Sequence, residues 1–171
     1  GGELFDRIVQ SGRFTEDVAR KHFRQLVDGV AYCHEEGVAH RDLKSLNVLM
    51  FAGDVAKVSD FGCSRKSDIT QTLRKTNAQA VGTVAYLAPE GHEEHRFTAE
   101  GDVYAFGVII NEVVTGLVPW KGSSAPQVTL KVCKGLRPRV PLSAEFDPPA
   151  LKALMQKCLA QDPAERPSVD A

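Results

Sequence analysis

Residues 38–50, "VAHRDLKSLNVLM", place an unusual set of polar side chains directly beside an apolar run. The polar residues are His40, Arg41, Asp42, Lys44 and Asn47. The stretch follows a long amphipathic pattern and leads into apolar residues from Val48 onward, as expected for a loop between a helix and a strand. A carboxylate, a cation and an amide in one such loop can face a single pocket.

Composition and charge narrow the classes of protein. The chain has 171 residues, 43% of them hydrophobic and 25% charged, which suits one globular domain with its own core. A net charge of −1 offers no field that would attract nucleic acid or an anionic membrane. The most apolar run, which begins at Val103, is too short to span a bilayer and contains Asn111 and Glu112. Four scattered cysteines without a C-x-x-C pair predict a reducing, intracellular compartment, and we expect a cytoplasmic location.

The periodicity of the sequence predicts mostly helices with one small β-hairpin. Thr15 can cap a long amphipathic helix that ends at Gly37, and a second, largely buried helix runs from about Glu100 to Gly116. Two further helices are expected over 125–134 and 149–160. Between the first two of these helices, "NVLMF" and "VAKVSD" predict two strands joined by a turn at 52–54.

The hairpin adds two oxygen ligands to the loop. Asn47 precedes the first strand and Asp60 follows the second, so the folded hairpin can bring them together. A carboxylate and an amide oxygen suit Mg²⁺. Phosphoryl transfer requires such a metal, a cation on the moving group and a carboxylate that orients the acceptor hydroxyl. The loop and hairpin supply all three.

The motifs "HRDLKSLN", "DFG" and "APE", in this order, resemble the signature set of the eukaryotic protein kinases. The resemblance continues to both ends, because "GGELFDRI", "GDVYAFGVI" and "DPAERPS" are similar to segments of the large kinase lobe. "SDFG", "DVYAFGV", "GLVPW" and "GLRPRVP" look like the tyrosine-kinase-like group of serine/threonine kinases. The resemblance implies an α+β family fold, of which residues 1–171 form the mainly α C-terminal lobe, with an activation segment at 60–90.

The resemblance also implies a role for each residue of the loop and hairpin. Asp42 would be the catalytic base for a protein Ser/Thr hydroxyl, and Lys44 would contact the γ-phosphate of ATP. Asn47 and Asp60 would hold Mg²⁺. Lys44 together with Thr83 favours Ser/Thr over Tyr as the acceptor.

Other residues would bind the nucleotide or support the loop. Leu49 would form the floor of the adenine pocket, and Glu3 would meet the ribose hydroxyls. Asp102 would cap the backbone of the catalytic loop. Glu90 of "APE" would form an ion pair with Arg166 across the lobe.

The activation segment carries the expected regulation. Arg41 would meet a phosphate on one of the Ser or Thr residues within 67–76, which makes an upstream kinase a candidate partner. His40 and Phe61 would stack as packing residues beside the loop.

Several alternatives stay open. The Gly-rich phosphate loop and the small-lobe lysine are not found in the 171 residues, so we expect a fragment that is inactive alone. The first rival is a pseudokinase or truncated product that serves as a binding scaffold. The second is a small-molecule phosphotransferase with a related Asp…Asn loop, although "GT…APE" resembles a platform for protein substrates.

Overall fold

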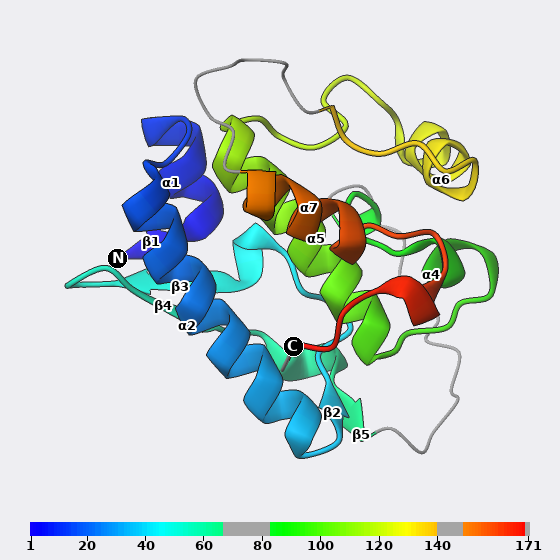
Figure 1. Ribbon diagram of the computed structural model, residues 1–171, viewed down its shortest axis with the longest axis horizontal. Helices are drawn as coiled ribbons and strands as arrows, with labels where there is room; N and C mark the ends of the chain where they lie inside the picture. Colours follow the sequence, from blue (N-terminus) through cyan, green and yellow to red (C-terminus); the bar gives the residue numbers. More distant parts are fainter. Residues whose placement is uncertain (67–82, 140–148, 170–171) are drawn as a thin grey trace.

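The computed structural model describes residues 1–66, 83–139 and 149–169. Its strands are β1 (Gly2–Glu3), β2 (Val38–Ala39), β3 (Val48–Phe51), β4 (Val55–Val58) and β5 (Arg65–Lys66). Its α-helices are α1 (Leu4–Ser11), α2 (Glu16–Glu35), α4 (Pro89–Glu93), α5 (Ala99–Thr115), α6 (Ala125–Cys133) and α7 (Pro149–Cys158). Short 3₁₀ turns are η1 (Ser45–Asn47), η2 (Phe61–Cys63) and η3 (Pro163–Glu165). The described part of the chain is mainly helical, as predicted, and it contains small antiparallel sheets (Figure 1).

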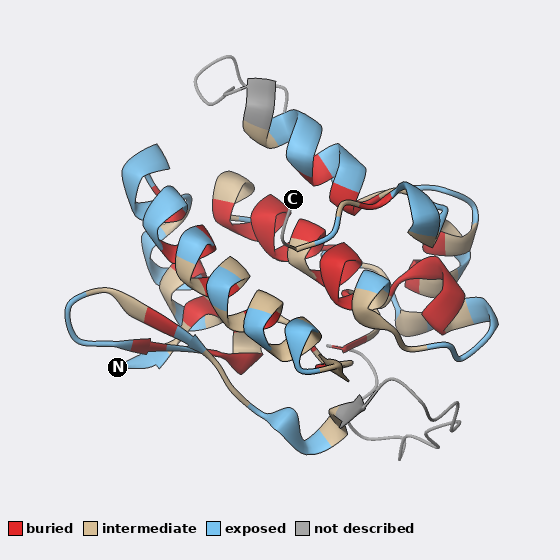
Figure 2. Ribbon diagram, turned by 60° about the horizontal axis from the view of Figure 1, so that its bottom comes forward, coloured by how far each residue is buried: buried red, intermediate tan, exposed pale blue. Residues whose placement is uncertain are grey.

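Helix α5 forms the centre of the molecule. It packs against α7 and α2 and is buried along most of its length, whereas the neighbouring helices keep exposed outer faces (Figure 2). A helix enclosed in this way can be apolar on most sides, which explains the run from Val103. At Gly107 an added Cβ would lie 2.9 Å from the Cβ of Cys158, so a glycine is needed for the close approach of α5 and α7.

Helix α2 covers one side of α5 and the hairpin. Its N-cap is Thr15, as predicted, although the Thr15 side chain makes no capping hydrogen bond. Its buried face consists of Ala19, His22, Phe23, Leu26 and Val30. The helix ends at Glu35, two residues before the predicted end at Gly37. Gly37 has a φ of 71°, a left-handed conformation that glycine adopts readily, and the chain changes direction there.

The predicted hairpin is present and belongs to a larger sheet. Strands β3 and β4 are antiparallel, with Val48 opposite Val58, and β1 adds a third strand that places Glu3 opposite Leu49. A separate pairing joins β2 to β5. We did not predict β1, β2 or β5, because strands of two residues carry no usable periodicity. The extra pairings fix both ends of the loop that follows β2. No helix of the described residues is long and apolar enough to cross a membrane.

His22 is an anomaly in this packing. Its side chain is fully buried against Phe14, and neither ring nitrogen has a hydrogen-bond partner among the described residues. Burial lowers the pKa of His22, and the nearby Arg7 guanidinium lowers it further, while Asp54 acts in the opposite direction. Below about pH 6.5 the unfolded chain therefore binds a proton that the folded protein resists, so stability falls as the pH falls.

We expect His22→Leu to stabilise the protein by about 1 kcal/mol or more at pH 7.5, because it removes, at similar volume, buried nitrogens that lack a partner in the described part of the chain. The gain should be larger at pH 5.5, where wild-type His22 opposes folding most strongly. Thermal unfolding at both pH values measures it. His95→Asn, at an exposed position with positive φ, is the control. An equal gain at both pH values would contradict the assigned role of the histidine.

Candidate active site

The backbone of the loop after β2 is held by a buried carboxylate from α5. Asp102 Oδ2 accepts a hydrogen bond from the His40 amide at 2.7 Å, and Oδ1 accepts one from the Arg41 amide at 2.8 Å. The predicted capping role of Asp102 is thus confirmed. His34 Nε2 also lies 2.9 Å from Asp102 Oδ2, a contact that we did not predict. These bonds hold Arg41 at a φ of 68°, which is unfavourable for a residue with a side chain.

His40 connects the loop to the hairpin. Its Nε2–H donates to the carbonyl oxygen of Ser59 at 2.9 Å, and its Nδ1 accepts from the amide of Asp42 at 3.3 Å. This arrangement requires the neutral ring with its proton on Nε2. The ring also lies 4.8 Å from that of Phe61, so the predicted packing of the two rings is confirmed.

Three of the predicted site residues are in direct contact. Lys44 Nζ donates to Asp42 Oδ2 at 2.8 Å, and Asn47 Nδ2 donates to the carbonyl oxygen of Asp42 at 2.8 Å and to Oδ2 at 3.3 Å. Lys44 Nζ also lies 3.3 Å from Thr83 Oγ1. The Asp42 and Lys44 side chains keep 11% and 14% of their surface exposed, so both are held yet accessible. The cluster offers a carboxylate to accept a proton and an ammonium to meet a phosphoryl oxygen.

Asn47 and Asp60 are the two candidate metal ligands. The amide nitrogen of Asn47 is used by Asp42, which leaves its side-chain oxygen for a cation. The Ser59 amide donates to the Asn47 carbonyl at 2.8 Å, so the backbone places Asp60 one residue from this contact. Asp60 is exposed, with a left-handed backbone at φ 62°. An amide oxygen and an accessible carboxylate fit Mg²⁺ that also binds water and phosphate.

Glu3 and Leu49 lie opposite one another in β1 and β3. Residues directly opposite in an antiparallel pair project to the same face of a sheet. Leu49 is 37% exposed, and Glu3 borders a hollow of about 380 Å³ that Asp6 also lines. Both are therefore accessible, as their predicted contacts with adenosine require.

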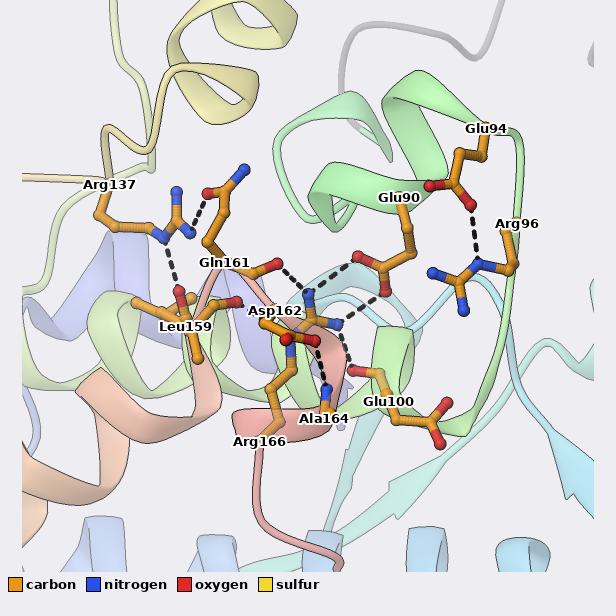
Figure 3. Close-up of polar contacts among 11 residues, drawn as sticks. Glu90, Glu94, Arg96, Glu100, Arg137, Leu159, Gln161, Asp162, Ala164 and Arg166 are labelled. Atoms are coloured by element: carbon orange, nitrogen blue, oxygen red, sulfur yellow. Dashed lines mark hydrogen bonds and ion pairs between the residues drawn. The ribbon is translucent and has the colours of Figure 1, made fainter.

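Glu90 and Arg166 form a buried bidentate ion pair (Figure 3). The two nitrogen–oxygen distances are 2.7 and 2.8 Å, and the side chains are 3% and 0% exposed. Arg166 donates further to the backbone carbonyls of Glu100 and Ala160. The predicted pair is confirmed, and it joins α4 to the start of α5 and the chain after α7.

A second buried cluster behind the loop was not predicted. Ser45 Oγ lies 2.9 Å from the hydroxyl of Tyr86, which donates to Glu112 Oε1 at 2.8 Å. Burial raises the pKa of Glu112 to about 7 and that of Tyr86 well above its ordinary value. One feature of the sequence could have indicated this cluster. Glu112 lies within an apolar helical run, and a buried acid requires a polar partner because a buried charge is costly.

Comparison with known proteins identifies the class. The model of the protein kinase domain family matches residues 1–171, and the chain belongs to this family. Among its relatives, CBL-interacting serine/threonine-protein kinase 8 of Arabidopsis thaliana is 41% identical over 93% of the chain. CBL-interacting serine/threonine-protein kinase 1 of the same plant is 37% identical over 99% of the chain. Mitogen-activated protein kinase kinase kinase mkh1 of Cytospora mali is 36% identical over 98% of the chain.

The matches cover a limited part of each relative. The chain spans 33% and 37% of the two Arabidopsis proteins and 9% of the Cytospora protein. The activity of the whole protein is therefore inferred below from the site.

Proposed function

We propose that this chain is the C-terminal lobe of an ATP- and Mg²⁺-dependent protein serine/threonine kinase. The observation that carries the proposal is the contact of Asp42 with both Lys44 and Asn47, in a loop that Asp102 holds to the central helix. Relatives named serine/threonine-protein kinases support it. Transfer of the γ-phosphate of ATP to a generic protein substrate by the complete protein, with Asp42→Asn as the control, is the direct test.

The geometry supports a role for each residue of the site. Asp42 accepts the proton of the acceptor hydroxyl while orienting it, since its carboxylate is held yet accessible. Lys44 donates a hydrogen bond to the phosphoryl group, and its contact with Thr83 holds it toward the acceptor side. Asn47 and Asp60 hold Mg²⁺ through oxygen, and the bound ion neutralises phosphate charge.

Adenosine binding is proposed for the strands beside the loop. Leu49 supports the adenine from below and Glu3 meets the ribose hydroxyls, which the accessible positions of both residues support. In this family the nucleotide lies between two lobes, so the lobe described here supplies one wall. Residues 1–171 alone are accordingly proposed to be inactive.

Regulation and finer classification are also proposals. The candidate phosphorylation sites within 67–76 lie outside the described residues. Arg41 directly precedes Asp42, and the amides of His40 and Arg41 donate to the Asp102 carboxylate, so the loop backbone at Arg41 is fixed. This placement supports recognition of a phosphate by Arg41 and hence an upstream kinase as a partner. A cytoplasmic location and membership of the tyrosine-kinase-like group are proposed from the sequence alone. The relatives above carry other names: two are CBL-interacting serine/threonine-protein kinases and one is a mitogen-activated protein kinase kinase kinase.

The proposed metal site leads to a specific expectation. In the complete protein, Asp60→Ala should raise the Mg²⁺ concentration required for half-maximal activity about tenfold or more, because a charged oxygen ligand is lost. A magnesium titration of activity at fixed ATP measures this. Asp28→Ala, on the exposed face of α2, is the matched control. An unchanged magnesium requirement would place the metal elsewhere.

A further inference from the structure

Two polar contacts join α1 and α2 to the turn at 52–54, which connects β3 to β4 (Figure 1). Arg7 Nη2 of α1 forms an ion pair with Asp54 Oδ1 at 2.7 Å, and Lys21 Nζ of α2 donates to the carbonyl oxygen of Gly53 at 2.9 Å. We call the region where these elements meet the corner, and the two contacts its tethers. Both tethers lie at the surface, where such contacts contribute little to stability.

The space between α1 and the turn is not filled by side chains. A hollow of about 380 Å³ lies there, and Glu3, Arg7 and Asp54 are among the residues that line it. At this hollow the ion pair, and not close apolar packing, sets the separation of α1 from the turn. Glu3 is the N-cap residue of α1 and lies opposite Leu49 in the sheet, so a movement of α1 would reach Glu3.

His22 lies behind the tethers without a polar partner. Its side chain is fully buried, and neither ring nitrogen has a hydrogen-bond partner among the described residues. Phe14 covers one side of the ring, with a distance of 5.6 Å between ring centroids, and the Phe14 amide donates to the Val113 carbonyl of α5 at 3.2 Å. Phe14 is therefore fixed to the central helix, whereas α1 and the turn are joined at the corner by the surface tethers.

Three charged groups act on the His22 ring. Burial is the main cause that lowers the pKa of His22, and the cations Arg7 and Lys21 add to it. Asp54 acts in the opposite direction. The Arg7 guanidinium holds the pKa of Asp54 below its ordinary value, so this carboxylate keeps its charge at pH 5.5. Histidine has an ordinary pKa of about 6.5, so the ring is the group of this set whose charge can change between pH 7.5 and 5.5.

A protonated His22 does not suit the closed corner. An imidazolium has two N–H donors, and the described residues offer an acceptor to neither nitrogen. The added charge would also repel Arg7 and Lys21, the two cations of the tethers. A buried charge without a partner is costly, so the ring must reach water to be protonated. Separation of α1 from the turn admits water and breaks only the exposed contacts.

We propose that His22 is a pH-dependent switch, whose protonation opens the corner between α1 and the turn at 52–54. A ring that is neutral when the corner is closed and titrates near pH 6.5 when it is open raises the equilibrium constant for opening about tenfold from pH 7.5 to 5.5. Opening moves Glu3 relative to Leu49 and thereby lowers the affinity for ATP in acid. This last step rests on the proposed kinase function, and the opening itself does not.

The first experiment measures amide hydrogen exchange of the complete protein at pH 7.5 and 5.5, in peptides that cover α1 and the turn. The exchange rate of wild type is divided by that of His22→Leu at the same pH, because intrinsic exchange rates change with pH. We expect this ratio to be up to about tenfold larger at pH 5.5 than at pH 7.5. His22→Phe keeps a ring against Phe14, cannot titrate and should behave as His22→Leu does. A ratio that does not change with pH would overturn the proposal.

The same measurement separates local opening from unfolding of the whole protein. At pH 5.5 the amides of α1 and the turn should have a lower free energy of opening than those of α5, and low denaturant concentrations should not accelerate their exchange. Equal free energies of opening in all three segments would contradict a local switch.

Asp54→Asn tests the tether, because it breaks the ion pair with Arg7 while His22 is retained. It should accelerate exchange of the turn at both pH values. Asp28→Asn, on the exposed face of α2, is the matched control and should leave exchange of the turn unchanged. Equal exchange in Asp54→Asn and Asp28→Asn would contradict the role of the tether.

The second experiment measures equilibrium binding of a fluorescent ATP analogue to the complete protein. The Kd of wild type divided by that of His22→Leu at the same pH should rise several-fold from pH 7.5 to 5.5, since titration of the nucleotide phosphates cancels in this ratio. A constant ratio, with exchange that responds to acid, would overturn the effect on ATP. Absence of binding by wild type at pH 7.5 would instead count against the proposed kinase function, so the two failures are distinguishable.

Discussion

Asp42→Asn, made in the complete protein, is expected to reduce turnover about 100- to 10,000-fold, the range for loss of a general base. The amide has nearly the shape of the carboxylate but cannot accept the hydroxyl proton. Asp42 faces the acceptor hydroxyl in the proposed site, so the affinity for nucleotide should change little. The two effects are measured by phosphate transfer to a protein substrate and by equilibrium binding of a fluorescent ATP analogue.

The geometry around Asp42 makes this variant informative. The backbone amide of Asp42 donates to His40 Nδ1, and the backbone carbonyl of Asp42 accepts from Asn47 Nδ2. Neither hydrogen bond involves the carboxylate, so the loop should keep its shape. Asp28→Asn, on the exposed surface of α2, provides the same chemical change away from the loop. Near-normal turnover of Asp42→Asn would exclude Asp42 as the base. Inactivity of the wild-type protein itself would favour the alternative of a kinase-like scaffold.

Arg166→Met is expected to lower the free energy of unfolding by about 3–5 kcal/mol, because it leaves the buried carboxylate of Glu90 without its partner. The two side chains have almost no contact with solvent, so water cannot replace the lost hydrogen bonds. Denaturant unfolding of the complete protein, monitored by the fluorescence of Trp120, measures the change in the free energy of unfolding.

Two further variants separate the ion pair from other effects of the substitution. Arg96→Met breaks the exposed contact with Glu94, which Figure 3 shows beside the buried pair, and should change stability little. The double variant Glu90→Gln with Arg166→Met removes both charges and should be more stable than Arg166→Met alone. Equal stability of the single and double variants would argue against an uncompensated charge as the cause.

The elements with strong periodicity were predictable from the sequence. The apolar face of α2, the enclosed helix α5 and the hairpin of β3 and β4 each have a pattern that matches one structure. The ends of the helices were predicted less exactly than the helices themselves: α2 ends at Glu35 and not at Gly37. Pairings such as β1 with β3 depend on contacts between distant segments, which no local pattern records.

The candidate site was predictable where a recognised motif named its residues. The contacts of Asp42 with Lys44 and Asn47, the capping by Asp102 and the Glu90–Arg166 pair all follow motif positions. The contact of His34 with Asp102 and the link from Ser45 to Glu112 were missed, because each partner is ordinary in its local sequence. The predicted roles in phosphate transfer and in binding ATP and Mg²⁺ stay predictions until the variants are measured.

The bonds that shape the loop join residues far apart in the chain, and this has a consequence for synthesis. His40 and Asp102 are separated by 62 positions, and Glu90 and Arg166 by 76. A nascent chain that has not reached residue 102 carries the whole "HRDLKSLN" sequence without the carboxylate that shapes its backbone. A ribosome adds only about 5–20 residues per second, so the motif exists for seconds before its supporting helix is made. The working geometry of the loop is therefore formed late, because its residues are translated 62 positions before the carboxylate that holds them.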